Sequence, residues 1–215
     1  MFTFFDFALF AVSLFAIAKG SLVGLKRQNL VFSGYALGAL FLALVTVLPA
    51  TADILSEAGY SIDAELLSGW FRICAISLTL CSLAVLIRNS KPQFARFPMF
   101  FCAVPLVLIA TYPYASHTLV LKEWLIGAYQ GGAIFILLMV HLVLLRTSRS
   151  HALILGGAGV LVLAYLFFWF PVILPVETPW LWKLLLASGI VVVTIGYDRI
   201  PEVGLSRNIP GQASA

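Results

Sequence analysis

Charged residues are scarce in this sequence. Only 10% of the 215 residues are Asp, Glu, Lys or Arg, whereas 62% are hydrophobic. A water-soluble domain is typically about a quarter charged, so this few charges could not cover a surface that faces water. The composition therefore excludes a soluble globular domain and predicts that most of the chain lies in lipid.

Cysteine is also rare. Cys74, Cys81 and Cys102 all lie in apolar runs, form no CxxC pair and have no histidine at metal-binding spacing. Neither a disulfide framework nor a zinc site is expected from this pattern.

Only three histidines are present. His141 lies toward the inner end of its apolar run and is interpreted as a lone polar residue. His117 falls in a connector and His151 at a boundary, so no histidine pair across the bundle is expected to hold haem. We expect no cofactor and no bound metal.

Catalytic motifs are absent as well. The sequence contains no HExxH, GxSxG or Walker loop, and no Ser, His and Asp at one membrane depth. No catalytic residues are expected, and an enzyme acting on lipids is the least favoured function. No inverted repeat with matching broken helices is found, which weakens a coupled transporter. The net charge of +4 is spread over short connectors rather than one patch, so no nucleic-acid partner is expected.

Seven apolar segments occupy most of the chain. Their lengths are those of bilayer-crossing helices and predict an all-α bundle of seven transmembrane helices. They form one transmembrane domain, residues 1–198, followed by a short cytoplasmic tail, residues 199–215. The first segment is expected to be retained rather than cleaved, because no basic residue precedes its apolar core and Asp6 lies where a signal peptide would carry a positive charge. The helices are placed at 4–25, 29–50, 67–88, 97–114, 119–145, 151–174 and 179–197.

Basic residues lie in alternate connectors. By the positive-inside rule this places the N-terminus outside and the C-terminus in the cytoplasm. We expect the membrane to be a bacterial inner membrane. The acidic segment 53–65, with four carboxylates and no Lys or Arg, marks the outer face and is a candidate lid above Arg72. The basic residues on the inner side are Lys26, Arg27, Arg88, Lys91, Arg96, Arg146, Arg149, Arg199 and Arg207; the outer connectors include those around His117 and Glu177.

Aromatic residues gather near the predicted outer helix ends. Trp and Tyr favour the membrane interface, so an interfacial belt is the main interpretation. The alternative is that some of them line an outward-facing pocket. The residues are Tyr60, Trp70, Tyr112, Tyr114, Trp124, Trp169, Trp180 and Trp182.

Two GxxxG pairs, Gly34 with Gly38 and Gly127 with Gly131, predict close helix contacts. Packing inside one bundle is the main expectation. The alternative is a homo-oligomer formed through either glycine face.

Ionisable residues inside membrane helices indicate functional sites by default, because each is costly to bury. Asp6, Arg72, Glu123 and Lys183 are predicted near the outer ends of the first, third, fifth and seventh helices. We expect Asp6 to pair with Arg72, and Glu123 with Lys183, around an outward-open ligand-binding vestibule. The alternative is that each is an independent interfacial anchor. Lys19, near an inner helix end, is expected to reach the headgroups with its side chain.

Tyr129 and Gln130 lie at the middle of the fifth helix. A buried amide must find hydrogen-bond partners in lipid. Gln130 is therefore expected either to join neighbouring helices or to contact a ligand.

Lys183 on a seventh helix resembles the retinal-binding lysine of microbial rhodopsins. The resemblance ends there, because Lys183 lies near a helix end and Pro179 replaces the carboxylate expected one turn earlier. The third helix also lacks an internal acid that could serve as a counter-ion. Retinal is not expected.

By its layout, the chain resembles the seven-helix input regions that precede kinases and cyclases in bacteria. We expect a non-enzymatic membrane receptor or sensor-type module with an outward-facing site. The tail 199–215 is too short for an output domain, so the signal would pass through a partner membrane protein. A small-solute or lipid transporter or channel is one alternative. An accessory or assembly subunit of a larger membrane complex is the other.

Overall fold

The structure is a computed structural model of the chain. It describes residues 3–27, 29–60, 63–90, 98–114, 119–146, 148–170 and 180–200. The basic connector 91–97, the connector at His117, the connector with Pro171, Pro175 and Glu177, and the tail beyond Ile200 lie outside the described residues. The predictions made for them stay predictions.

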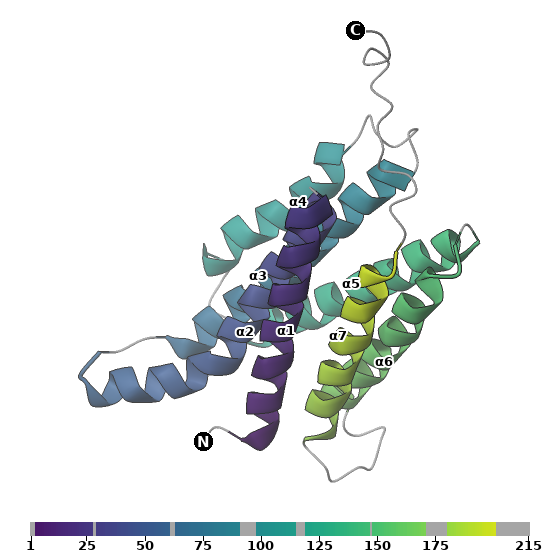
Figure 1. The fold of residues 1–215 in the computed structure, drawn as a ribbon. Helices are drawn as coiled ribbons and strands as arrows, with labels where there is room; N and C mark the ends of the chain where they lie inside the picture. The colour runs from purple at the N-terminus through teal and green to yellow at the C-terminus, as the bar shows by residue number, and fades with distance from the viewer. Residues whose placement is uncertain are drawn as a thin grey trace, which may run out of the picture.

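The described residues form seven α-helices, a short 3-10 turn and no strand, which confirms the all-α membrane bundle (Figure 1). Six helices are long and apolar enough to cross a membrane. The exception is α4, which has 14 residues. The elements are α1 (Phe4–Arg27), α2 (Leu30–Glu57), α3 (Ala64–Ser90), α4 (Pro98–Thr111), η2 (Tyr112–Tyr114), α5 (Leu119–Leu145), α6 (His151–Trp169) and α7 (Leu181–Asp198).

Large apolar side chains cover the outside of the bundle. Leu25 is 79% exposed, Phe4 77% and Trp124 73%. Such a surface is stable only where the surrounding medium is itself apolar. The chain is therefore an integral membrane protein. Its orientation in the membrane stays a prediction, and we name the two ends of the bundle by the residues they carry, the Asp6 end and the Asp198 end.

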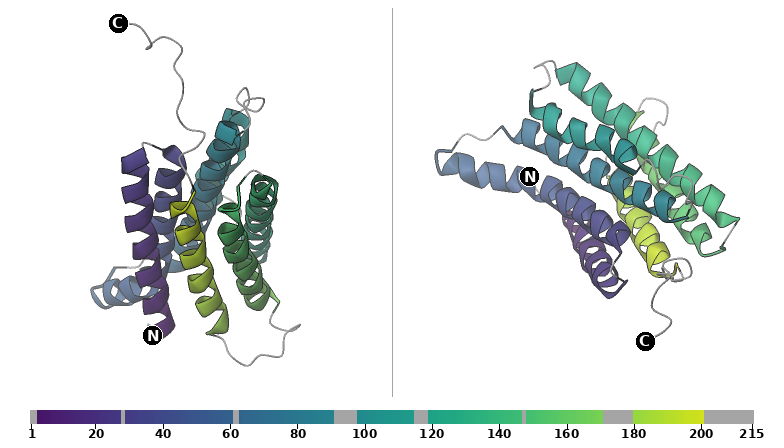
Figure 2. Two further views of the ribbon diagram at one scale, coloured as in Figure 1. Left: turned by 45° about the vertical axis from the view of Figure 1, so that its right-hand side comes forward. Right: turned by 90° about the horizontal axis from the view of Figure 1, so that it is seen from above.

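Six of the helices close into a ring. Along the chain α1 packs on α2, α2 on α3, α3 on α5, α5 on α6 and α6 on α7, and α7 returns to pack on α1. The fourth helix, α4, packs on α3 outside this ring (Figure 2). Tyr112 fixes it there, because its ring is buried with Ile73 of α3 and Ile126 of α5 in a second apolar cluster.

The acidic segment 53–65 is two helix ends rather than an open connector. Gly59, at φ +85°, ends α2 after its last residue, Glu57, and the Asp63 carboxylate accepts from the Leu66 backbone N–H at 2.9 Å as the cap of α3. Pro49 lies inside α2, and the helix after it runs away from the bundle (Figures 1 and 2). This end of α2 does not cover the ring, so the predicted lid is not seen.

The predicted end of the sixth helix, at residue 174, also shifts. The helix ends at Trp169, and Phe170 follows with φ −125° and ψ 54°. Phe170 precedes Pro171, and the proline ring disfavours a helical conformation in the residue before it.

Both GxxxG pairs are used inside the bundle. A Cβ atom on Gly38 would lie 2.8 Å from Thr79 Oγ1 and 3.0 Å from the Ala75 carbonyl oxygen, both on α3. On α5, Gly127 and Gly131 accommodate the aromatic rings of α6. Glycine is thus required where α2 approaches α3 and where α5 approaches α6.

Candidate functional site

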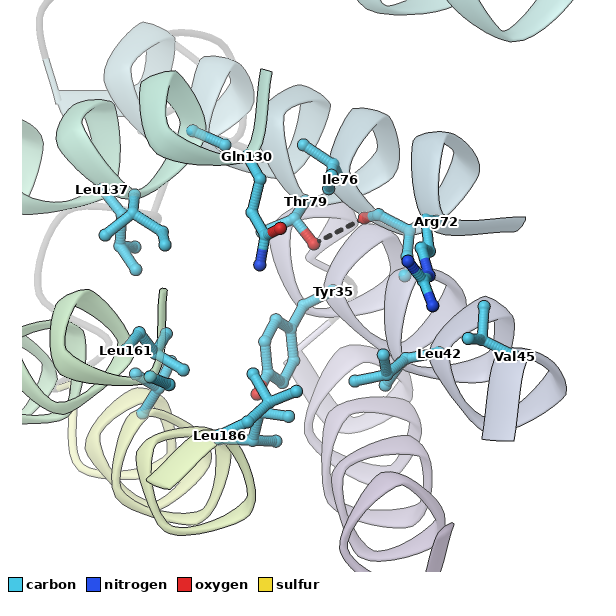
Figure 3. Close-up of a pocket in the computed structure, with 18 of the residues that line it drawn as sticks. Tyr35, Leu42, Val45, Arg72, Ile76, Thr79, Gln130, Leu137, Leu161 and Leu186 are labelled. Atoms are coloured by element: carbon cyan, nitrogen blue, oxygen red, sulfur yellow. Dashed lines mark hydrogen bonds between the residues drawn. The ribbon is translucent and has the colours of Figure 1, made fainter. Parts of the chain in front are cut away.

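The ring of six helices surrounds a partly open cavity of about 240 Å³. Each of α1, α2, α3, α5, α6 and α7 contributes residues to its wall, and α4 contributes none of the lining residues described. Leu, Ile, Val and Ala make up most of this wall (Figure 3). The volume is many times the roughly 15 Å³ that one water molecule needs, so the cavity can hold a small organic molecule.

Helical spacing explains how the cavity extends along the bundle. On α7 the wall is formed by Trp182, Leu186, Ile190, Val193 and Tyr197, which recur every three or four residues and so share one face. Fifteen residue steps of helix rise about 22 Å. The cavity therefore runs from the Asp6 end, at Trp182, to Tyr197 near the Asp198 end.

Arg72 brings a positive charge to the wall of the cavity near the Asp6 end. Its guanidinium carbon lies 6.0 Å from the centre of the Phe168 ring on α6. The Phe168 ring in turn packs edge-on against Trp182 of α7, with 4.8 Å between ring centres. A cation held over an aromatic face gains part of the stabilisation that it loses with its hydration.

No carboxylate among the described residues forms an ion pair with Arg72. The two ion pairs of the described ranges join other residues, Lys19 with Asp198 and Lys183 with Asp6. A guanidinium presents five N–H donors in a planar fork that fits carboxylate and phosphate groups. Arg72 is therefore equipped to bind an anionic group inside a mostly apolar cavity.

Gln130 supplies a second polar group and points into the cavity from α5 (Figure 3). Its amide oxygen accepts a hydrogen bond from the indole N–H of Trp169 at 3.2 Å. This bond joins α5 to α6 and fixes the amide plane. Gln130 thus combines the two roles expected of it from the sequence, an interhelical contact and a polar group facing the cavity.

The cavity is closed toward the Asp198 end by hydroxyl and aromatic groups. Tyr35 on α2 and Thr194 on α7 share a hydrogen bond at 2.7 Å between their hydroxyl oxygens. The Tyr197 ring packs against both Tyr35, at 5.3 Å, and Phe32, at 6.0 Å between ring centres. Thr194 also donates to the Ile190 carbonyl of its own helix, so it has no donor left for a ligand.

The predicted pairs of ionisable residues are wrong. Asp6 binds Lys183 at 2.6 Å rather than Arg72, and Lys183 is therefore not the partner of Glu123. The order of helices explains the difference: α7 is the neighbour of α1 in the ring, whereas α2 lies between α1 and α3. Glu123 is exposed at the start of α5.

Tyr129 faces away from the cavity. Its hydroxyl shares a hydrogen bond with Ser77 of α3 at 3.0 Å, and its ring belongs to the second apolar cluster. Neighbouring residues of a helix point about 100° apart, so Tyr129 and Gln130 serve different contacts. Of the six candidate site residues, Arg72 and Gln130 line the cavity, and Asp6, Lys183, Tyr129 and Glu123 do not.

Some aromatic residues near the Asp6 end line the cavity, and others lie on the outside of the bundle as an interfacial belt would. Trp182 lines the cavity, whereas Trp124 is largely exposed on the outside of the bundle. Trp180 stacks on Phe5 of α1, with 5.1 Å between ring centres.

The sequence reasoning missed the contact between His141 and His151. Their ring centres lie 5.4 Å apart, and both side chains are buried. A signal was available, since the two histidines lie near the facing ends of consecutive helices joined by a short connector.

Comparison with protein families, curated proteins and solved structures gives no match to this chain.

Proposed function

We propose that the chain is a non-enzymatic, receptor-type membrane module that binds a small, mostly apolar molecule carrying an anionic group. The observation that carries this proposal is Arg72, a permanent cation in the wall of an apolar cavity, without an ion-pair partner among the described residues. Placing such a charge in a membrane helix is costly. The Glu123 carboxylate acts on Arg72 electrostatically but forms no ion pair with it, so a bound anion would be the direct partner that Arg72 lacks among the described residues.

The chemistry of the cavity wall supports binding rather than catalysis. Its described lining residues include Arg, Gln, Thr and Tyr but no Asp, Glu, His, Cys or Ser. A general base or an activated nucleophile normally comes from that second group. The wall therefore offers recognition groups without a catalytic pair.

The groups at the Asp198 end of the cavity support a binding site that a ligand reaches from the Asp6 end. The bond between Tyr35 and Thr194 and the ring of Tyr197 block the Asp198 end. The ligand would enter at the Asp6 end, which the sequence predicts to be the outer one. We further propose that the protein lies in the bacterial inner membrane and passes its signal to a membrane protein partner.

Photo-crosslinking in nanodiscs tests the proposal. A diazirine-labelled fatty acid is expected to label the cavity faces of α3, α5, α6 and α7, and decanoate should compete with it far better than decanol. Losing hydrogen bonds to a charged donor costs about 1.5–3 kcal/mol, so Arg72→Gln is expected to weaken competition by decanoate roughly tenfold or more.

Lys122→Gln is the matched control. It removes the same charge from a lysine that lies over the Tyr112 ring, 5.6 Å from its centre, outside the cavity. Equal labelling of Arg72→Gln and the unaltered chain, or equal competition by decanol and decanoate, would overturn the proposal.

A transporter is the second candidate, favoured by the two ion pairs on the interface between α1 and α7. Lys183 with Asp6 joins these helices at one end, and Lys19 with Asp198 joins them at the other. Such pairs could open alternately on the two sides of the cavity. Uptake of labelled naphthalene sulfonate into proteoliposomes separates the candidates, because a transporter gives uptake that Arg72→Gln abolishes, and a receptor gives binding alone.

A further inference from the structure

Two buried imidazoles face each other near the Asp198 end of the bundle, apart from the cavity wall. His141 of α5 is 0% exposed and His151 of α6 is 6% exposed. Their ring centres are 5.4 Å apart, with 55° between the ring planes. Nε2 of His141 and Nδ1 of His151 are both buried without a hydrogen-bond partner in the described part of the chain.

The backbone fixes which nitrogen of His141 carries its proton. Nδ1 lies 2.9 Å from the Leu137 carbonyl oxygen, which can only accept, so Nδ1 of the neutral ring is the protonated donor. Nε2 then has a bare lone pair. Metal-binding histidines show this arrangement, in which one ring N–H donates to a backbone carbonyl and the other nitrogen binds the metal.

The spacing of the rings fits one metal ion between them. Zinc lies about 2.0–2.1 Å from each imidazole nitrogen, which places two rings on one ion roughly 5 to 6 Å apart between centres. The observed 5.4 Å falls in this range. A direct hydrogen bond between the two free nitrogens is not formed in the structure.

We propose that Nε2 of His141 and Nδ1 of His151 together bind one first-row transition metal ion of the class that imidazole favours, Zn²⁺ or Cu²⁺. The described residues contain no group of three or more His, Cys, Asp or Glu side chains that could hold a metal. The protein therefore supplies two ligands, and water or a small anion completes the coordination. Sequence reasoning expected no metal, because it treated His141 as isolated.

The Tyr197 ring connects this site to the cavity. It packs edge-on against His141, with 5.7 Å between ring centres, and it also lines the cavity wall. The metal site is nevertheless separate from Arg72, and it does not depend on the proposed ligand.

Cu²⁺ binding tests the proposal directly. The full chain, purified without a histidine tag and treated with EDTA, is reconstituted in nanodiscs and titrated with Cu²⁺. We expect one ion per chain and an electron paramagnetic resonance spectrum with hyperfine coupling to two imidazole nitrogens. Zn²⁺ should displace the copper.

His141→Ala and His151→Ala are each expected to weaken Cu²⁺ binding at least tenfold and to remove the two-nitrogen coupling. His117→Ala, which changes the remaining histidine of the sequence, is the matched control and should bind as the unaltered chain does. His141→Asn keeps a side-chain donor and serves if His141→Ala fails to fold. Absence of stoichiometric binding, a spectrum that persists in both alanine variants, or its loss in His117→Ala would overturn the proposal.

Discussion

Lys183 Nζ lies 2.6 Å from the Asp6 carboxylate and so joins the last helix of the bundle to the first. Asp6 also accepts from the Thr3 backbone N–H at 3.0 Å, which holds the carboxylate at the start of α1. Both charged side chains are 21% exposed. The pair closes the six-helix ring at its Asp6 end.

Removing one member of this pair is expected to destabilise the protein. Breaking a buried ion pair costs about 3–5 kcal/mol, and with the partial exposure of both side chains we expect about 1–3 kcal/mol for Lys183→Met or Asp6→Asn. Unfolding in mixed detergent micelles measures the loss. In a double-mutant cycle, the changes in the free energy of unfolding caused by Asp6→Asn and Lys183→Met should be coupled. Substitutions of Asp6 and Arg72 should instead be additive, because α2 lies between their helices.

The second ion pair of the same interface should contribute less. Lys19 and Asp198 are 2.9 Å apart, but their side chains are 43% and 38% exposed. Exposed pairs are worth about 0.2–1 kcal/mol, so Lys19→Met should change the free energy of unfolding by no more than that. A loss larger than that of Lys183→Met would contradict this ranking.

Gly38→Ala should destabilise the contact between α2 and α3. The added Cβ would lie 3.0 Å from a backbone carbonyl oxygen of α3, which cannot move aside as a flexible side chain can. Overpacking of this kind costs about 1–3 kcal/mol. Gly132→Ala on α5 is the matched control, because the added Cβ would meet nothing within 4 Å. Alanine favours the helix over glycine by about 1 kcal/mol, so this variant should not be destabilised.

The same variants test the oligomer hypothesis. If Gly34 and Gly38 serve only the contact within the bundle, Gly38→Ala lowers the unfolding temperature without changing the mass of the particle in nanodiscs. A shift from dimer to monomer would instead support a face shared between two copies.

The short helix α4 sets the topology of the second half of the chain. Its 14 residues rise about 21 Å, less than the roughly 30 Å of the hydrocarbon core. We expect α4 to cross nevertheless, because only an odd number of crossings keeps all the basic connectors on one side. A reporter inserted at residues 115–118 should read as outside and one fused after Ala215 as cytoplasmic. An extracytoplasmic reading after Ala215 would show that the count of seven crossings is wrong.

Much of the helical architecture was predictable because the signal is local. Twenty apolar residues have few stable options in lipid other than a helix, and the predicted segments match the observed helices to within several residues at most ends. Proline chemistry accounts for the shorter α6, and the cap by Asp63 accounts for the earlier start of α3. The sequence already indicates Pro171 or Pro175 as the end of the sixth helix, and the cap could have been inferred from Asp63 in the same way.

The candidate site was predictable only in part. The cost of burying a charge or an amide singled out Arg72 and Gln130, and both line the cavity. The partner of Asp6 was not predictable, because the order of helices around a ring depends on long-range packing rather than on local spacing. The contact of His141 with His151 is different, because the two residues lie near the facing ends of consecutive helices and could have been inferred from the short connector between them.

The ring is closed by helices that are far apart in the order of synthesis. Asp6 enters the membrane with the first helix, but its partner is encoded 177 residues later. While the ribosome makes the helices between them, Asp6 has no lysine beside it and the lumen of the ring is open on one side. Assembly of the ring is therefore completed only once α7 has been made, and a chain that stops before Lys183 carries an Asp6 carboxylate without its lysine partner.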